Sequence, residues 1–424
     1  MLHAALTALL LFQTASGSPN VAPPASKPGV TGGGSSAAAA PSQSDAPASP
    51  DAAPVTAAPP APAATPTPGP RRATTPAAKP SNDTLLVVNK TDGTVSILDA
   101  ATGKLRTSVT VEAGPHEVEV LADGQTAAVS SYGTKAAPGR MVTLIDIPTG
   151  KAVSRVDIGE GSRPHGMKAL PDGRLLVTAE GKRELVVVDP RAAKVTARFP
   201  TGHDVSHMVA SSPDGRQAYV TSLTPGSLTV LDLVSGKIVK DIPTGKGAEG
   251  LDVTPDGREV WVANREANTI MVIDVKTLAP VFSIKAAEFP IRVKITPDGR
   301  RAVASFTGTG DVRVYDTATR VEASRIPIGR EAVEGTETRV FQKRFGSSPA
   351  PVGLLIAPDG KRAFVSAAHA DVVAVIDLEK LRVDDAWTAG HEPDGIAASF
   401  GAKGPEPTPR PTPPRRPTMA RRPG

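Results

Sequence analysis

Residues 250–284 have the sequence GLDVTPDGREVWVANREANTIMVIDVKTLAPVFSI, and this stretch decides the fold. Pro255-Asp256-Gly257 within it is a tight-turn signal. No helical periodicity of apolar residues runs through it, whereas β-branched residues are frequent, which is typical of β-strands. We expect four segments to form strands: 250–254, 259–263, 269–274 and 280–284. The stretch therefore predicts four short antiparallel strands in succession.

This unit recurs along the chain. Pro-Asp-Gly returns with its glycine at Gly173, Gly215, Gly257 and Gly299, a constant interval of 42 residues. A fixed period of this size indicates a repeat architecture, and four antiparallel strands per repeat predict the blade of a β-propeller. We predict seven second strands, one for each unit: 85–89, 127–131, 174–179, 218–222, 259–264, 302–306 and 363–367. We therefore predict an all-β fold, a seven-bladed β-propeller.

Two further features concern the ring itself. The third strand of each unit ends in an aspartate, which we expect to accept backbone N–H bonds in the following turn. These residues are Asp99, Asp146, Asp189, Asp232, Asp274, Asp316 and Asp377. The repeats begin with a second strand at 84–89 and end with a first strand at 395–400. We expect this last strand to complete the first blade and to close the ring, which removes an exposed sheet edge.

The units resemble the YVTN repeat, most closely at 218–222 with 228–232 and at 260–264 with 270–274. The chain is thus similar to bacterial YVTN-family, YncE-like seven-bladed propellers of the lactonase-like superfamily. The resemblance covers 84–400 and implies the fold, while such propellers include binding proteins, lactonases, lyases, and metal or haem proteins. Relatives with haem d1 have eight blades, and the absence of Cys excludes attachment of a c-type haem.

Composition divides the chain into four parts. Residues 1–17 resemble a secretory signal, with an apolar stretch too short to span a bilayer. Residues 18–80 are nearly all Pro, Ala, Ser, Thr and Gly, which predicts a disordered linker. The propeller is predicted at 81–400, followed by a basic, Pro/Arg-rich disordered tail at 401–424. We therefore expect a periplasmic or secreted bacterial protein with no transmembrane segment.

The positive charge lies in the tails. Residues 401–424 hold six Lys and Arg against one Glu, whereas the whole chain has a net charge of +5. Such a tail is expected to contact an anionic cell-envelope polymer or lipid through screened attraction, or else to act as an inert solubilising segment. The chain has only two Trp and three Tyr, which argues against a base-stacking surface and against nucleic acid as a partner.

One face of the ring is expected to carry the long loops. By the predicted strand order, the insertions 132–140 and 329–351 both lie on that face, where function usually resides. The second insertion contains Phe341 and Phe345 among basic residues, and we expect it either to cap the channel or to be a passive loop. Every histidine beyond His3 is predicted on the same face. We take His203, His391, Phe341 and Phe345 as candidate ligand-binding residues.

Equivalent positions just before the first strands form a polar arc at the predicted mouth of the channel. The aligned residues are Asp394, His116, His165, His207 and Glu249, followed by Ile291 and Val352. Imidazoles converging from adjacent blades are a ligand set for zinc, copper or iron, with carboxylates as flanking ligands or bases. The same imidazoles could instead hydrogen-bond an acidic ligand, or Pro-His could be a local turn preference. The arc is therefore predicted as a metal or ligand site.

These features favour an exported propeller that binds a small ligand, an ion or a protein on its loop-bearing face. One alternative is a metal-dependent enzyme, a lactonase or other hydrolase, a lyase or an oxidoreductase, in which bound metal activates water at the histidines. Another is a purely structural scaffold for protein interaction. The sequence contains no Ser-His-Asp spacing, phosphate-binding glycine loop or dinucleotide fingerprint that would favour a particular enzyme class.

Overall fold

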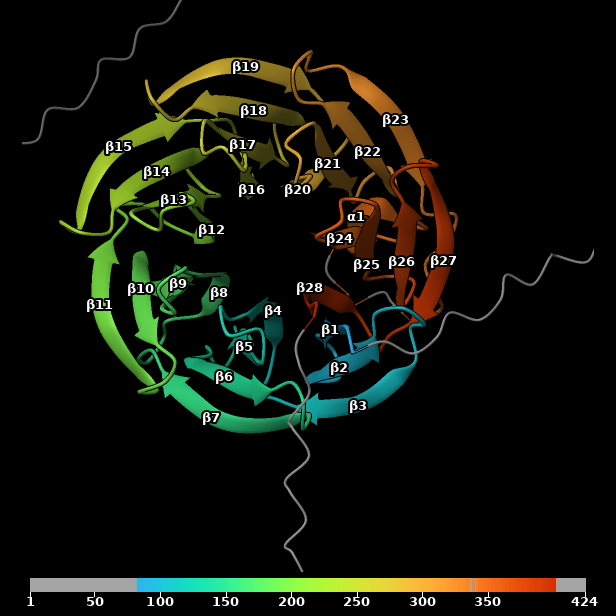
Figure 1. Ribbon diagram of the computed structural model, residues 1–424, viewed down its shortest axis with the longest axis horizontal. Helices are drawn as coiled ribbons and strands as arrows, with labels where there is room; N and C mark the ends of the chain where they lie inside the picture. The colour runs from blue at the N-terminus through green and yellow to red at the C-terminus, as the bar shows by residue number, and fades with distance from the viewer. Residues whose placement is uncertain (1–81, 336–337, 340, 402–424) are drawn as a thin grey trace, which may run out of the picture. The chain divides into compact units, whose positions relative to one another are not determined.

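The computed structural model describes residues 82–335, 338–339 and 341–401, which form a ring of seven four-stranded antiparallel sheets (Figure 1). The innermost strands are β4 (Pro115–Val120), β8 (Pro164–Ala169), β12 (Ser206–Ser211), β16 (Ala248–Val253), β20 (Pro290–Ile295), β24 (Pro351–Ile356) and β28 (Pro393–Ser399). The second strands are β1 (Thr84–Asn89), β5 (Thr126–Ser131), β9 (Leu175–Ala179), β13 (Gln217–Ser222), β17 (Glu259–Asn264), β21 (Arg301–Phe306) and β25 (Arg362–Ala367). The all-β seven-bladed propeller is therefore confirmed.

The remaining strands complete each blade outward. The third strands are β2 (Thr94–Asp99), β6 (Met141–Asp146), β10 (Glu184–Asp189), β14 (Ser227–Asp232), β18 (Thr269–Asp274), β22 (Asp311–Asp316) and β26 (Val372–Asp377). The outer strands are β3 (Leu105–Thr110), β7 (Lys151–Asp157), β11 (Lys194–Pro200), β15 (Lys237–Pro243), β19 (Ala279–Lys285), β23 (Glu322–Pro327) and β27 (Arg382–Thr388). The short helices are η1 (Glu180–Lys182) and α1 (Gln342–Phe345).

Blade 1 contains strands from both ends of the repeat region, as expected. Strand β28 pairs antiparallel with β1, with Thr84 opposite Ser399 and Val87 opposite Ile396. Blades 2 to 7 follow in chain order, from β4–β7 to β24–β27. The predicted signal, the linker and the basic tail lie outside the described residues. Within the described part, no helix is both long and apolar enough to cross a bilayer.

The hydrophobic core lies between the blades. Leu86 and Val88 of blade 1 pack with Val118 and Val129 of blade 2 in one buried cluster, and further clusters join other neighbouring blades. Middle strands are buried on both faces, since all six residues of β1 are buried. Burying each such aliphatic side chain contributes about 1.5–3 kcal/mol, so the blades stabilise one another rather than folding singly.

The aspartates at the ends of the third strands brace turns, as predicted. Asp232 Oδ1 accepts hydrogen bonds from the backbone N–H groups of Val234 and Ser235, at 3.0 and 2.7 Å. The six equivalent residues accept bonds from their own turns, from Asp99 to Asp377. These seven carboxylates therefore serve the fold.

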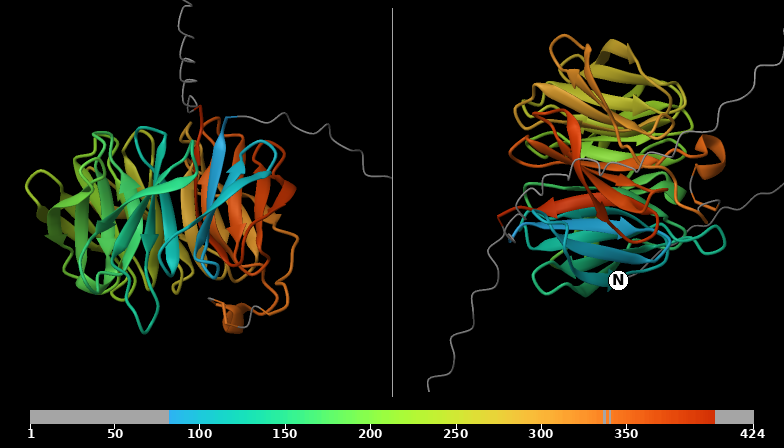
Figure 2. Two further views of the ribbon diagram at one scale, coloured as in Figure 1. Left: turned by 90° about the horizontal axis from the view of Figure 1, so that it is seen from below. Right: turned by 90° about the vertical axis from the view of Figure 1, so that its right-hand side faces the viewer.

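Both long loops lie on one face of the ring, which we call the insertion face. In the left view of Figure 2, α1 and the teal loop that follows β5 project from the same side. The loop at 132–140 folds back on itself through a bridge between Gly133 and Pro138. The crossover between β23 and β24, at 328–350, contains α1. The mouth of the channel described next opens on this face.

Candidate ligand-binding site

A β-bulge at the start of each inner strand shapes the mouth of the channel. In β4, for example, Pro115 pairs with Ser131 and Val118 with Val129, so His116 and Glu117 lie in the bulge. The second residues of all seven inner strands line a single cavity of about 290 Å³, and they are His116, His165, His207, Glu249, Ile291, Val352 and Asp394. The predicted arc, with its polar and apolar parts, is thus brought together at the mouth.

Glycines at the third position let neighbouring inner strands approach each other. A Cβ added at Gly166 would lie 2.6 Å from the carbonyl oxygen of His207, and one at Gly250 would lie 2.5 Å from that of Ile291. Gly353 and Gly395 are equally crowded by the next strand. The close approach fixes the spacing between the residues of the mouth.

Buried hydroxyls of the second strands tie four of the seven mouth residues to the preceding blade. Thr178 Oγ1 donates to the carbonyl oxygen of His207 at 2.7 Å, and Thr221 Oγ1 donates to that of Glu249 at 2.6 Å. Ser305 and Ser366 make the same contact with the next blade. These hydroxyls position the functional side chains through their backbone.

Three imidazoles from adjacent blades stack along the polar side of the cavity. Ring centroids are 4.5 Å apart between His116 and His165, and 3.9 Å apart between His165 and His207, with tilts of 38° and 34°. Tyr132, from the loop after β5, meets His116 and His165 edge-on at 5.3 and 5.7 Å. The three imidazoles thus form a tilted stack, with Tyr132 edge-on against two of them.

His207 is held between two carboxylates. Its Nδ1 lies 3.2 Å from Glu180 Oε1 and its Nε2 lies 2.8 Å from Glu249 Oε1. Burial opposes the charged imidazolium, but Glu249 and Glu180 together raise the pKa of His207 to about 9. Burial likewise opposes charge on Glu249, yet His207, Arg265 and Arg292 hold the pKa of this carboxyl well below its usual range. At neutral pH, His207 is therefore protonated and Glu249 is ionised.

Among the described residues, His165 has no charged partner on its ring, unlike His207. The residue is 3% exposed, and its Nδ1 has no hydrogen-bond partner. Burial, followed by the positive charges of His207 and other neighbours, holds the pKa of His165 well below its usual range. An unpartnered buried polar atom costs roughly 1–3 kcal/mol, so it is an exception that calls for a partner.

His116 lies between an acid and a base at the edge of the arc. Its Nδ1 is 2.8 Å from Asp394 Oδ2, and its Nε2 is 2.8 Å from Lys90 Nζ. Lys90 Nζ also lies 3.8 Å from Asp394 Oδ2. Burial opposes charge on the carboxyl, but His116 and Lys90 lower the pKa of Asp394 to about 2. Asp394 is therefore a paired carboxylate.

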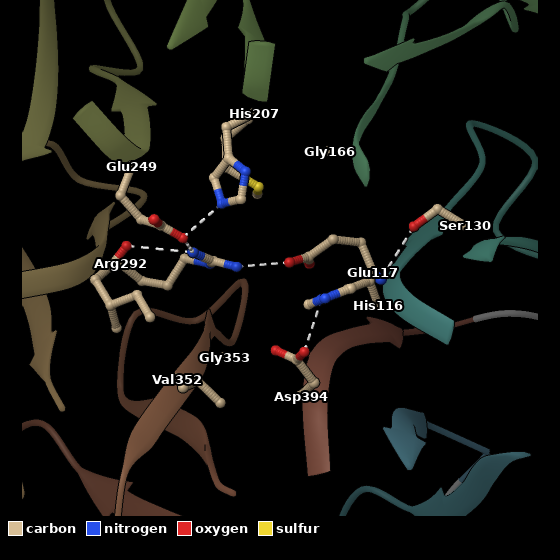
Figure 3. A network of polar contacts seen from close by, with 12 residues as sticks. His116, Glu117, Ser130, Gly166, His207, Glu249, Arg292, Val352, Gly353 and Asp394 are labelled. Carbon is tan, nitrogen blue, oxygen red and sulfur yellow. Dashed lines mark hydrogen bonds and ion pairs between the residues drawn. The ribbon is translucent and has the colours of Figure 1, made fainter. Parts of the chain in front are cut away.

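Arg292 forms the floor of the cavity. It extends from blade 6 across the channel, where one nitrogen lies 2.6 Å from Glu117 Oε1 of blade 2 and another lies 3.0 Å from Glu249 Oε1 (Figure 3). Arg292 lines both the mouth cavity and a smaller cavity of about 70 Å³ below, which Glu117 also lines. The pair therefore separates the two spaces.

The opposite side of the cavity is apolar, and the insertion contributes one residue to it. Ile291 and Val352 are joined there by Phe341, which packs edge-on against buried Phe289 at a centroid distance of 4.9 Å. Phe345 meets Phe289 at the same distance but does not line the cavity. Of the two predicted aromatic residues, Phe341 therefore lines the mouth and Phe345 packs behind it.

Ion pairs hold the insertion in place. Both terminal nitrogens of Arg339 contact the Asp371 carboxylate, at 2.6 and 2.9 Å, and one also donates to the carbonyl oxygen of Ala368. Arg344 contacts Glu266 at 3.1 Å. These contacts anchor the segment to the insertion face.

Two candidate residues lie away from the cavity. His203 Nε2 is 2.8 Å from Asp241 Oδ2, and the exposed His391 is 2.7 Å from Asp92 through its Nδ1. Neither histidine lines the mouth, so a ligand in the cavity would not contact them. Each one is instead paired with an aspartate on the insertion face.

Several residues of the site were not predicted. Arg292, Glu117, Glu180, Tyr132 and Arg265 all take part in the network around the imidazoles. Glu180 comes from η1, directly after β9, and Tyr132 from the insertion after β5. The unusual third residues Glu117 and Arg292, where four other repeats have glycine, are a signal that could have revealed the floor.

The predicted metal ligands do not converge on one point. Among the residues that the structure describes, no group of three or more His, Asp or Glu side chains is arranged to hold a metal ion. The rings stack, and both nitrogens of His207 face carboxylates. The zinc, copper or iron site therefore stays a prediction that requires the imidazoles to turn.

Comparison with known proteins supports the fold. The profile of the family described as Cytochrome D1 heme domain matches residues 172–294, less than half of the chain. No curated protein gives a significant match. Hydrazine synthase of Kuenenia stuttgartiensis is 22% identical, with a TM-score of 0.53 over 63% of this chain and 77% of that chain. A functionally unknown protein of Desulfotomaculum acetoxidans is 14% identical, with a TM-score of 0.61 over 74% of this chain and 98% of that chain.

The matched profile raises the question of a haem. Haem iron requires an axial ligand such as His, Met, Tyr or Cys. His207 has both nitrogens on carboxylates, and the Nδ1 atoms of His116 and His165 are buried. A cavity of about 290 Å³ lies at the lower end of the range for small-molecule sites. The residues of the mouth, as arranged here, therefore do not fit a tetrapyrrole.

Proposed function

We propose that this protein is an exported, YVTN-type propeller that binds a compact amphipathic molecule in the mouth cavity. The observation that carries the proposal is the division of the cavity into an imidazole wall and an apolar wall that includes Ile291, Val352 and Phe341. Ligand sites are typically concave and mostly apolar, with a few polar groups that fix orientation. The proposal that the protein is exported rests on the signal-like sequence of residues 1–17, which lie outside the described residues.

The geometry supports binding rather than catalysis. The carboxylates Glu249 and Asp394 have cationic partners, and their pKa values are lowered, so neither is suited to act as a general base near neutral pH. The metal-dependent enzyme suggested by the sequence would need at least two imidazoles freed from their present neighbours. A zinc or copper titration of the wild type with the His116→Ala and His165→Ala variants tests that alternative directly.

The test of the binding function uses 3-phenylpropanol, a neutral molecule with an apolar body and a polar head. We expect millimolar or tighter binding to the wild type by isothermal titration. Val352→Trp fills the apolar side of the cavity and should abolish it, whereas Val234→Trp, at a position 72% exposed, should leave it unchanged. Binding that is absent from the wild type, or equal in Val352→Trp, would overturn the proposal.

A further inference from the structure

Lys90 lines the mouth cavity and has an imidazole as its nearest polar neighbour. Its side chain is 20% exposed. Its Nζ lies 2.8 Å from His116 Nε2 of the next blade, whereas Asp394 Oδ2 is 3.8 Å away, beyond hydrogen-bond reach. Lys168, by contrast, contacts a carboxylate, Glu119, at 3.3 Å. Lys90 therefore shares a proton with a nitrogen base.

The second nitrogen of the His116 ring faces a negative charge. Nδ1 is 2.8 Å from Asp394 Oδ2, at an angle that is poor for a hydrogen bond, so the carboxylate acts on the ring through its charge. A negative charge at this distance stabilises the imidazolium. A nucleophile beside a base, with a third group that supports the base, is the usual arrangement of an activated nucleophile. Lys90, His116 and Asp394 have this order, with the amine at the cavity.

From this geometry we propose that Lys90 is a nucleophile that forms a reversible imine with a compact amphipathic aldehyde, and that His116 is the base that accepts its proton. The proposal rests on the binding function given above and names the reactive group of the ligand. An aldehyde suits the cavity because its carbonyl is a small polar head on an apolar body. The imine is then a covalent but reversible form of binding.

Lys90 lies where the polar and apolar parts of the cavity meet. Val352, Asp394 and His116 are the second residues of β24, β28 and β4, the inner strands of the adjacent blades 7, 1 and 2. The apolar side at Val352 thus borders on Asp394, to which Lys90 extends from the same blade 1. A ligand with its body against Val352 and Phe341 would bring its head to blade 1, where the amine lies.

The reaction balances without an oxidant or a reductant. His116 Nε2 takes a proton from the Lys90 ammonium, and the free lone pair of the amine forms a bond to the carbonyl carbon. The π electrons of the carbonyl move to its oxygen, which takes that proton back from His116. His116 then removes a second proton from the nitrogen and delivers it to the hydroxyl, which leaves as water while the nitrogen lone pair forms the C=N bond. The product is a protonated imine, so the positive charge beside Asp394 is kept.

The experiment uses 3-phenylpropanal, which has the apolar body of the 3-phenylpropanol probe and an aldehyde head. Sodium cyanoborohydride supplies the hydride that converts the imine to a stable secondary amine. Limiting aldehyde is mixed with the full chain at pH 7.5, and labelled peptides are quantified by mass spectrometry. We expect Lys90 to be labelled at least roughly tenfold faster than the exposed Lys135, because binding beside the amine replaces a bimolecular encounter. Excess 3-phenylpropanol should abolish that advantage.

Two substitutions separate the amine from its base. Lys90→Arg keeps a cation but has no amine that forms an imine, so labelling at this position should disappear. The matched control Lys135→Arg should leave the labelling of Lys90 unchanged. His116→Phe keeps a flat ring without nitrogen and should slow the labelling of Lys90 by at least roughly tenfold, since a general base commonly contributes more than that. Circular dichroism establishes whether each variant folds.

If the variants fail to fold, the wild type still decides the question through the ratio of Lys90 to Lys135 labelling. Equal labelling of the two lysines, while 3-phenylpropanol binds, would overturn the imine and leave the binding function intact. Preferential labelling that 3-phenylpropanol does not prevent would also overturn it, because the aldehyde would then react outside the cavity. A wild-type rate in His116→Phe would overturn the role of His116 as the base. Absence of both preferential labelling and alcohol binding would overturn both proposals.

Discussion

At the scale of single residues, the site depends on one buried charge. His207 connects Glu180 to Glu249, and Glu249 in turn connects to Arg292 and Arg265. Breaking a buried pair by removing one partner typically costs 3–5 kcal/mol, because the other charge is left uncompensated. The imidazolium of His207 therefore contributes to stability and also sets the positive charge beside His165.

This charge should make stability depend on pH. Because the pKa of His207 is raised to about 9 from about 6.5 in an unfolded chain, its contribution is fully present below about pH 6.5 and is lost as pH rises through 9. The contribution is roughly 3 kcal/mol. We expect His207→Gln to be less stable at pH 6 and to lose this alkaline dependence. Urea unfolding of the wild type and of His207→Gln at pH 6, 7.5 and 9 measures how the free energy of unfolding depends on pH.

The matched control is His203→Gln, a change to a partly exposed histidine paired with Asp241. This variant should keep the wild-type slope of unfolding free energy against pH. An identical slope in His207→Gln and in the wild type would show that the buried imidazolium does not produce the dependence.

The sequence predicted which residues meet at the mouth but not how they pair. The second residue of each inner strand could be aligned from the repeats, so His165 and Glu249 were placed correctly on the arc. Arg292 was missed because strand alternation would point a third residue away from the channel, and only the bulge turns it inward. The stacking of rings instead of their convergence depends on side-chain rotamers and charge, which no repeat pattern encodes.

At the scale of elements, neighbouring blades are coupled by hydroxyls as well as by apolar contacts. Thr178 lies in β9 of blade 3, is fully buried, and donates to the carbonyl oxygen of His207 in β12 of blade 4. Valine has nearly the same shape but no hydroxyl, so substitution isolates the hydrogen bond from packing. This hydroxyl should therefore contribute to the coupling between β9 and β12, beside the apolar cluster that the two blades share.

We expect Thr178→Val to lower the free energy of unfolding by about 1–3 kcal/mol, because it leaves a buried carbonyl with fewer donors. Thr196→Val, in the outer strand β11 where the hydroxyl contacts its own blade at 3.2 Å, should cost less than about 0.5 kcal/mol. Guanidinium unfolding of the two variants beside the wild type tests the difference. Similar losses in both would argue against coupling between blades.

At the scale of the whole molecule, the ring is closed by non-covalent pairing within blade 1. Strand β28 supplies the inner strand of that blade, and Ile396 is buried in a cluster shared with Phe364 of blade 7. Loss of β28 would expose the edge of β1 and remove one contact on each side of the gap. Closure was predictable because the first repeat lacks its own inner strand in the sequence.

A chain that ends at residue 401 should therefore melt close to the full chain, whereas one that ends at residue 392 should melt at least roughly 10 °C lower or lose cooperativity. The reason is that the shorter chain lacks β28 and the backbone ladder with β1. Circular dichroism during heating measures both transitions. Equal melting temperatures would be incompatible with a ring that depends on this strand.

The ion pair between Arg292 and Glu117 makes the two ends of the central channel different. These side chains lie between the mouth cavity and the smaller cavity below, so a ligand could pass from one to the other only if the ion pair opened. A ligand bound in the mouth would leave on the insertion face, where it entered, before a second ligand could bind. The rate at which a ligand dissociates would then limit how quickly the protein exchanges one ligand for another.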